Sequence, residues 1–210
     1  MTRSPWLGIP LSDYEAHMAL PEVAQAKLLA NVLESLLRTH RPRSLAIIGC
    51  AGGNGFDRVD PAVTRRVVGI DLNADYIAAA RERYGARTRG LELVACDVEN
   101  DELEIEPVDF VYAALVLEYV DVRRVLKRLH ALLIPGGMLA TVVQLPGSVP
   151  VTPSPFASLE TLTPVMHLVD PVVLEETARA SGYRGIERRR EQSGGGKQFE
   201  VQVFLAEVAS

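Results

Sequence analysis

The chain has 210 residues, of which 48% are hydrophobic and 23% are charged, and these values exclude a largely disordered chain. The formal net charge of −5 disfavours nucleic-acid binding, which requires a basic face. No apolar run approaches the roughly 20 residues that cross a bilayer, and the N-terminus lacks the apolar stretch of a secretory signal.

We therefore expect a single domain over residues 1–210 that buries a sizeable core. Two cysteines, Cys50 and Cys96, are too few for a disulfide framework. A reducing, cytoplasmic compartment follows as the expected location, with both thiols free.

Short apolar runs alternate with amphipathic segments through the middle of the chain. Pro21 suits the first turn of a helix with an apolar stripe, Asn73 and Asp121 suit helix N-caps, and Gly85 suits a helix end. The apolar runs are 44–49, 66–71, 91–96, 108–113 and 138–144. Near-continuous apolar strands alternating with helices predict a parallel sheet covered on both faces.

The segments before and after this alternating pattern do not continue it. Residues 1–20 show no periodicity and are predicted to be irregular, so that residues 1–40 form an N-terminal cap and helix. Residues 145–169 contain five prolines and are expected to form an inserted loop or lid over the site. Asp170-Pro171 begins a last helix that ends at Gly182, and two strands, 184–192 and 198–208, form an antiparallel hairpin. The predicted fold is α/β, a Rossmann-like, seven-stranded, mostly parallel sheet with a C-terminal antiparallel hairpin and helices on both faces.

A glycine-rich turn, Gly49 to Gly55, follows the first strand and is expected to open a helix, where backbone amides face a ligand. Asp71 ends the second strand, where a carboxylate can accept hydrogen bonds from ribose hydroxyls. Asp97 ends the third strand, and Ala113-Ala114 ends the fourth with small side chains. Because parallel sheets bind ligands at the carboxyl ends of their strands, these groups predict an adenosine-containing cofactor.

The spacing of the glycines separates cofactor classes. The dinucleotide pattern Gly-x-Gly-x-x-Gly is not present. Counted from Gly49, its second and third glycine positions are Ala51 and Asn54, and counted from Gly53 they are Gly55 and Arg58. No Lys-Ser or Lys-Thr pair follows the glycines, so the phosphate-loop pattern is also absent.

Five segments in order resemble the class I S-adenosylmethionine-dependent methyltransferase family, most closely its small-molecule branch. These are IIGCAGGNG, VVGIDL, ACDV, VDFVYAALVLEYV and LLIPGGMLATV, within residues 25–145. Two departures stand out: Ile47 occupies a position that is usually acidic in the family, which removes one polar anchor of the methionine end, and Ala51 replaces the second motif glycine.

The resemblance implies roles for matching residues. The turn would line the methionine side of the cofactor, the acid after the second strand would hold the ribose, the acid after the third would face the adenine, and the fourth-strand exit would lie under the sulfonium. The implied cofactor-binding residues are Gly49, Ala51, Gly53, Asp71, Leu72, Asp97, Val98, Ala113 and Leu115. The implied cofactor is S-adenosyl-L-methionine, with S-adenosyl-L-homocysteine as product.

Methyl transfer needs a general base only where the acceptor is protonated. His17, Glu118 and His167 are the candidates, and Tyr14 and His167 are expected to contact the acceptor. Each also has a plainer interpretation: His17 as a capping or packing residue, Glu118 as a structural group, and His167 as part of the packing of the lid. The histidines are scattered singly and the acids are not spaced as ligand sets, so no metal site is expected.

The sequence thus predicts methyl transfer from S-adenosylmethionine to oxygen or nitrogen of a small-molecule acceptor, without nucleic-acid or membrane partners. One alternative is a non-catalytic protein that binds S-adenosylmethionine or S-adenosylhomocysteine, which the substitution at Ile47 favours. The other is a nucleotide-dependent oxidoreductase, which the glycine spacing disfavours.

Overall fold

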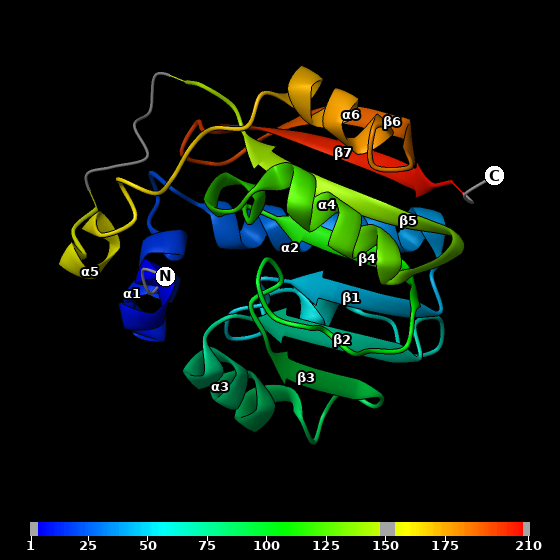
Figure 1. Cartoon of the computed structure of the whole chain (residues 1–210). Helices are drawn as coiled ribbons and strands as arrows, with labels where there is room; N and C mark the ends of the chain where they lie inside the picture. The colour runs from blue at the N-terminus through cyan, green and yellow to red at the C-terminus, as the bar shows by residue number, and fades with distance from the viewer. Residues whose placement is uncertain (1–3, 148–153, 208–210) are drawn as a thin grey trace.

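A computed structural model describes residues 4–147 and 154–207. Seven strands form one sheet in the order β3-β2-β1-β4-β5-β7-β6, with β7 antiparallel to both of its neighbours. The predicted sheet and its closing hairpin are therefore confirmed (Figure 1). The strands are β1 (Ser44–Ile48), β2 (Arg66–Asp71), β3 (Leu91–Ala95), β4 (Val108–Ala114), β5 (Leu133–Gln144), β6 (Tyr183–Gln192) and β7 (Gln198–Ala206).

Two apolar cores lie on opposite faces of this sheet. One contains α4 (Val122–Ala131) and α6 (Pro171–Arg179), whose Leu126, Leu129 and Leu174 are almost fully buried. The other contains α2 (Gln25–His40) and α3 (Ala74–Tyr84). Figure 1 shows α4 and α6 in front of the sheet and α2 behind it. The predicted helices thus cover both faces.

The predicted helix caps are formed as expected. The Asn73 side chain accepts a hydrogen bond from the Asp75 amide at 3.0 Å, and the Asp121 side chain accepts one from the Arg124 amide at 2.9 Å. Gly85 is the C-cap residue of α3. These side chains satisfy amides that the first turn of a helix leaves without partners.

The segment before β1 differs from the prediction. Residues 1–20 were expected to be irregular, but they include a 3-10 helix, Pro5–Gly8, and α1, Leu11–Ala19. Pro21 lies in the turn before α2, which begins at Gln25 rather than at the proline. Among residues of α1, only Met18 is buried, so the segment lacks the broad apolar stripe that marks a helix in sequence.

The segment after the glycine turn also differs from the prediction, because no α-helix follows the turn. Only a 3-10 turn, Phe56–Arg58, lies between the turn and β2. Gly53 and Gly55 have positive φ angles of 96° and 91°, and Pro61 follows shortly afterwards. Left-handed residues and a nearby proline both interrupt helical hydrogen bonding.

The end of the sheet toward which the parallel strands point is covered by two small helices. α5 (Ala157–Glu160) packs against α1, and Figure 1 shows both beyond the arrowheads of β1 and β2. The Ser158 hydroxyl donates to the Asp13 carboxylate at 2.7 Å, and Arg83 of α3 forms an ion pair with Glu15 of α1. Of the predicted lid at 145–169, residues 148–153 lie outside the described residues.

Candidate active site

A cavity of about 590 Å³ lies at the carboxyl ends of β1, β2, β3 and β4. We call it the strand-end cavity. Seven of the predicted cofactor residues line it: Gly49, Ala51, Asp71, Leu72, Asp97, Val98 and Leu115. Its volume is within the range of ordinary small-molecule and cofactor sites, roughly 300–1,000 Å³. The parallel strands therefore bring these separate sequence segments to one site.

Asp71 ties the glycine turn to the start of α3. One carboxylate oxygen accepts a hydrogen bond from the Ala51 amide at 2.8 Å, and the other accepts one from the Asn73 amide at 2.9 Å. Burial raises the pKa of this carboxyl, and the two backbone hydrogen bonds oppose that rise. A carboxylate has about four acceptor sites, so each oxygen can accept a further bond from a ligand hydroxyl.

Like Asp71, Asp97 accepts hydrogen bonds from the loop that follows its strand, here β3. Its side chain accepts hydrogen bonds from the Glu99 amide and from the Asn100 side chain, both at 2.9 Å. All three residues line the strand-end cavity, together with Val98. The loop therefore presents a half-buried carboxylate beside an apolar side chain, a combination suited to a planar, polar-edged ring.

Gly53 and Ala113 lie outside the lining of the strand-end cavity. A Cβ at Gly53 would lie 2.6 Å from a ring carbon of Tyr84, so this position faces the protein. Ala113 is fully buried and packs in the core on the α4 side. The cavity is lined instead by the next two residues, Ala114 and Leu115. The strand exit itself lies where the sequence predicted it, because β4 ends at Ala114 and the predicted residue Leu115 lines the cavity.

Ile47 lies on the opposite side of β1 from this cavity. It is 4% exposed, packs in the core with α2 and lines neither cavity described here. Ile48, its neighbour, lines the strand-end cavity. The position that is usually acidic in the resembled family therefore contributes only apolar packing in this chain.

A second cavity of about 260 Å³ adjoins the first. We call it the inner cavity. It lies among α1, the segment around α5, the end of β5 and the loop between β6 and β7. The residues that line it are Trp6, Tyr14, His17, Met18, Gln25, Leu115, Glu118, Tyr119, Gln144, Ser154, Leu159, Leu162, Thr163, Met166, Leu168 and Lys197.

Three aromatic rings and one leucine line both cavities: Trp6, Tyr14, Tyr119 and Leu115. Trp6 makes edge contacts with Tyr14 and Tyr119, at centroid distances of 5.7 and 5.0 Å. Trp6 and Tyr14 come from the N-terminal segment, and the carbonyl oxygen of Trp6 accepts a hydrogen bond from the Asn73 side chain at 3.1 Å. The cavities are therefore neighbours across a shared aromatic wall.

Glu118 is a buried carboxyl with one oxygen free of hydrogen bonds. It lies in the 3-10 helix Leu117–Tyr119 and is 0% exposed. Its Oε1 accepts a hydrogen bond from the Gln144 amide at 2.9 Å, and Oε2 has no partner among the described residues. Burial raises the pKa of Glu118 to about 7. This carboxyl can exchange a proton near neutral pH.

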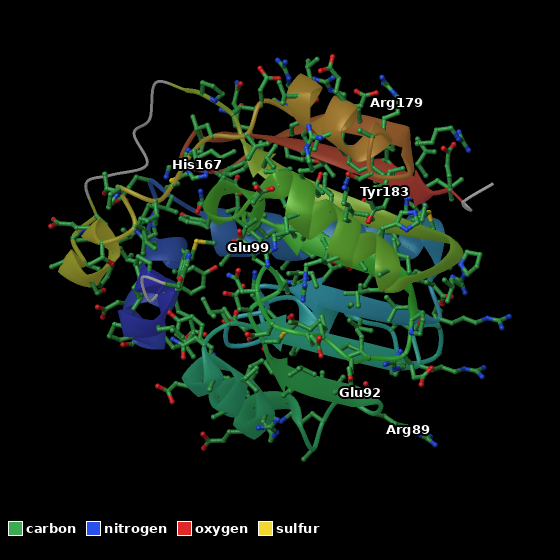
Figure 2. The ribbon with its side chains drawn as sticks, in the orientation of Figure 1. Arg89, Glu92, Glu99, His167, Arg179 and Tyr183 are labelled. Atoms are coloured by element: carbon green, nitrogen blue, oxygen red, sulfur yellow. The ribbon has the colours of Figure 1, made fainter. Side chains whose placement is uncertain are left out.

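The two candidate histidines lie in different settings. His17 lines the inner cavity, and its Nδ1 lies 3.0 Å from the Ser154 hydroxyl. Burial, followed by the charge of Lys197, lowers the pKa of His17. His167 was expected to face the acceptor, but its side chain is exposed and lines neither cavity; its backbone amide donates to the carbonyl of Glu118 at 2.9 Å (Figure 2).

Sequence reasoning missed three polar residues of the inner cavity. Gln25, Gln144 and Lys197 are each at most 5% exposed. The Gln25 side-chain amide donates to Gln144 at 3.4 Å. Gln144 ends a strand at the ligand-binding edge, a position that could have singled it out. Lys197 follows three glycines, a pattern typical of an exposed turn, so nothing in the local sequence indicated that it is buried in a cavity.

Within residues 4–147 and 154–207, no three His, Cys, Asp or Glu side chains are grouped as a metal site. None of the helices described is long and apolar enough to cross a membrane. Both cysteines are buried and free.

The strand order with a reversed β7 and a ligand cavity at the strand ends defines the fold of class I methyltransferases. Residues 47–141 match the family described as "Methyltransferase domain". The N-methyltransferase NodS from Bradyrhizobium japonicum, solved in complex with S-adenosylhomocysteine, superposes with a TM-score of 0.66 at 19% identity, covering 93% of this chain and 97% of that one.

Two curated relatives are similar in sequence. A malonyl-[acyl-carrier protein] O-methyltransferase of Pectobacterium atrosepticum is 32% identical over 64% of this chain and 50% of its own length. A trans-aconitate 2-methyltransferase of Variovorax paradoxus is 32% identical over 54% of this chain and 43% of its own. The family match over residues 47–141, the two relatives and the shared fold together support a class I S-adenosylmethionine-dependent methyltransferase. The chain spans about half the length of the curated relatives it matches.

Proposed function

We propose that this chain binds S-adenosylmethionine in the strand-end cavity and transfers its methyl group to oxygen or nitrogen of a small molecule in the inner cavity. The observation that carries the proposal is the contact between the two cavities across Trp6, Tyr14, Leu115 and Tyr119. A methyl donor and its acceptor must meet in line, and two adjoining cavities with a shared wall suit that requirement.

The lining of the strand-end cavity fits the proposed cofactor. Asp71 would accept hydrogen bonds from the ribose hydroxyls, and Asp97 with the Val98 backbone would face the adenine. The backbone of Gly49 and Ala51 would lie against the methionine part, while Leu72 and Leu115 supply apolar contact. Gly53 and Ala113 would act from behind the lining, by fixing the turn and the strand exit. When bound, the cofactor supplies an already activated methyl group on its sulfonium.

The protein's part in the reaction is positioning, exclusion of water and removal of a proton. The aromatic side chains of the shared wall exclude water from the region between the cavities. We propose that residues 1–40 and 145–169 close over this region as parts of one domain. The contacts of α1 with α3 and α5 support that arrangement for the described residues.

Glu118 is the group that we propose takes the proton of a hydroxyl or ammonium acceptor. Its Oε2 has no hydrogen-bond partner among the described residues, and its pKa of about 7 leaves a useful fraction ionised at neutral pH. His17 is the second candidate, because it lines the same cavity. The exposed side chain of His167 disfavours a direct role for that residue.

The acceptor class rests on the size of the inner cavity and on charge. A cavity of about 260 Å³ accommodates a small molecule, and a net charge of −5 disfavours a nucleic-acid acceptor. The names of the two relatives describe one acceptor carried on a protein and one free acid. We propose a free small molecule, and a cytoplasmic location in which the two buried cysteines stay reduced.

The test uses S-adenosylmethionine labelled in its methyl group, with a small-molecule cell extract, bulk tRNA and purified acyl-carrier protein as separate acceptors. The proposal predicts label in small molecules, with transfer reduced in Glu118→Gln. Label in tRNA or in the carrier protein would contradict the acceptor class. Retained binding of S-adenosylhomocysteine with no transfer to any acceptor would favour the non-catalytic alternative, which the apolar Ile47 supports.

A further inference from the structure

Lys197 is buried at the boundary of the inner cavity. It is 5% exposed, whereas the other two lysines of the chain, Lys27 and Lys127, are exposed. Lys197 immediately precedes β7, whose first residues pair with the end of β5. The turn before it packs tightly against the chain ahead of α2, since a Cβ at Gly195 would overlap the Glu22 backbone. Tertiary packing thus buries this lysine.

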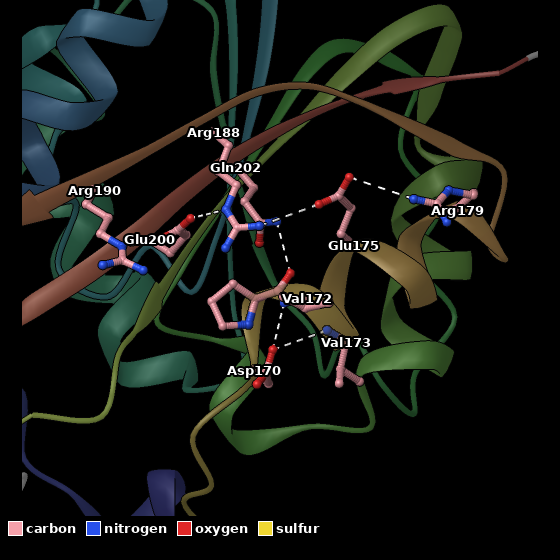
Figure 3. Close-up of polar contacts among 10 residues, drawn as sticks. Asp170, Val172, Val173, Glu175, Arg179, Arg188, Arg190, Glu200 and Gln202 are labelled. Atoms are coloured by element: carbon pink, nitrogen blue, oxygen red, sulfur yellow. Dashed lines mark hydrogen bonds and ion pairs between the residues drawn. The ribbon is translucent and has the colours of Figure 1, made fainter.

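No ion pair to Lys197 is formed within residues 4–147 and 154–207. Burial lowers its pKa. The arginines of the same hairpin differ: Arg188 and Arg190 both pair with the buried Glu200 (Figure 3). Holding a cation largely out of water without a partner costs free energy, and a negatively charged ligand would offset that cost.

The surroundings of Lys197 indicate the ligand's chemistry. Gln25 and Gln144 provide nearby side-chain amides, and His17 is close enough for the lysine charge to lower its pKa. The remaining wall is largely apolar, including Met18, Leu159 and Leu162. Glu118, the one carboxylate among the described lining residues, forms no ion pair with the lysine. The inner cavity therefore holds one lysine, one carboxyl and two side-chain amides within a largely apolar wall.

We propose, on the basis of the function proposed above, that the inner cavity takes an organic acid as methyl acceptor. Its carboxylate pairs with Lys197, its apolar part lies along the leucine and methionine side chains, and its reacting atom lies near Leu115, at the wall shared with the strand-end cavity. The carboxylate is thereby an anchor distinct from the methylated atom. Lys197 is a specificity-determining residue in this arrangement.

A carboxylate matches this site better than a phosphate monoester does. One lysine balances one negative charge, whereas a phosphate monoester carries about −1.5 to −2 at neutral pH. Excess charge in an otherwise apolar cavity would lack a counter-ion and would be costly to bury. Bidentate arginines, the usual partners of phosphate, are absent from the described lining of the inner cavity.

The experiment measures the affinity of hexanoate, hexanamide and hexyl phosphate for protein saturated with S-adenosylhomocysteine. We expect hexanoate to bind roughly 10-fold or more tightly than the neutral, similarly sized hexanamide, as expected for one charge-assisted contact. Lys197→Met should abolish that preference, Lys197→Arg should retain it, and Lys127→Met should behave as the wild type. All variants should bind S-adenosylhomocysteine equally.

Equal binding of hexanoate and hexanamide to the wild type, or no binding of hexanoate at all, would overturn the inference. So would a preference that survives Lys197→Met, or hexyl phosphate binding more tightly than hexanoate. Failure of the wild type to bind S-adenosylhomocysteine would instead count against the proposed function, so the two failures are distinguishable.

Discussion

Replacing Asp71 by asparagine separates the structural role of this carboxylate from its proposed role toward the cofactor. Its two oxygens accept hydrogen bonds from the amides of Ala51 and Asn73. In Asp71→Asn one oxygen becomes an NH₂ group, so one of these amides loses its acceptor. Leaving such a group unsatisfied costs about 1–3 kcal/mol of unfolding free energy. Urea unfolding measures this cost, and the exposed Asp57→Asn should change stability by under about 0.5 kcal/mol.

The same substitution should weaken cofactor binding through the ribose. A lost charge-assisted hydrogen bond, worth about 1.5–3 kcal/mol, predicts a decrease of roughly 10- to 100-fold in affinity for S-adenosylhomocysteine. Titration calorimetry with the 2′-deoxy analogue completes a cycle: the wild type should lose affinity for the analogue, and Asp71→Asn should discriminate less. A folded variant that binds S-adenosylhomocysteine as the wild type does would refute the assignment.

Three further predictions concern other parts of the molecule. The folded-state pKa of Glu118, about 7, exceeds the ordinary value of 4.5, so the stability contributed by this carboxyl is complete below pH 4.5 and is lost as pH rises through 7. The unfolding free energy of the wild type relative to Glu118→Gln should therefore fall by on the order of 3 kcal/mol between pH 4.5 and 8. A difference that does not change with pH would contradict the burial of the carboxyl. Trp6, the single tryptophan, lines both cavities, so binding of S-adenosylhomocysteine should change its fluorescence. Binding should also slow hydrogen exchange in residues 5–20 and 154–168, and equal exchange with and without ligand would exclude a closing role for these segments. Cys50 and Cys96 should react with a thiol reagent slowly in the native protein and completely after unfolding without reductant, and no reactive thiols in the unfolded protein would show a disulfide.

The repeated strand and helix pattern was sufficient to predict the parallel part of the sheet because β1, β2 and β4 are apolar runs bounded by turn residues. The caps at Asn73 and Asp121 were predictable for a similar reason, since a capping bond is made within a few residues of chain. Asp71 and Asp97 were placed correctly at the strand-end cavity because the ends of parallel strands meet at one edge.

The lining of the inner cavity could not be predicted from the sequence, because this cavity is formed by segments that lie far apart in the chain. Helix α1 buries only Met18, so its own pattern is weak, and its Asp13 and Glu15 contact residues far along the chain. Lys197 is buried only through packing of its turn against the segment before α2, and a glycine-rich turn with a lysine ordinarily lies in solvent. Non-local packing of this kind leaves no local signal.

The most direct test of methyl transfer between the two cavities is a crystal structure of the protein with S-adenosylhomocysteine. We expect the nucleoside to lie in the strand-end cavity, with the ribose hydroxyls on the Asp71 carboxylate, the adenine beside Asp97 and Val98, and the sulfur facing the inner cavity at Leu115. Binding at any other place, or with the sulfur turned away from the inner cavity, would contradict the proposed methyl transfer between the two cavities.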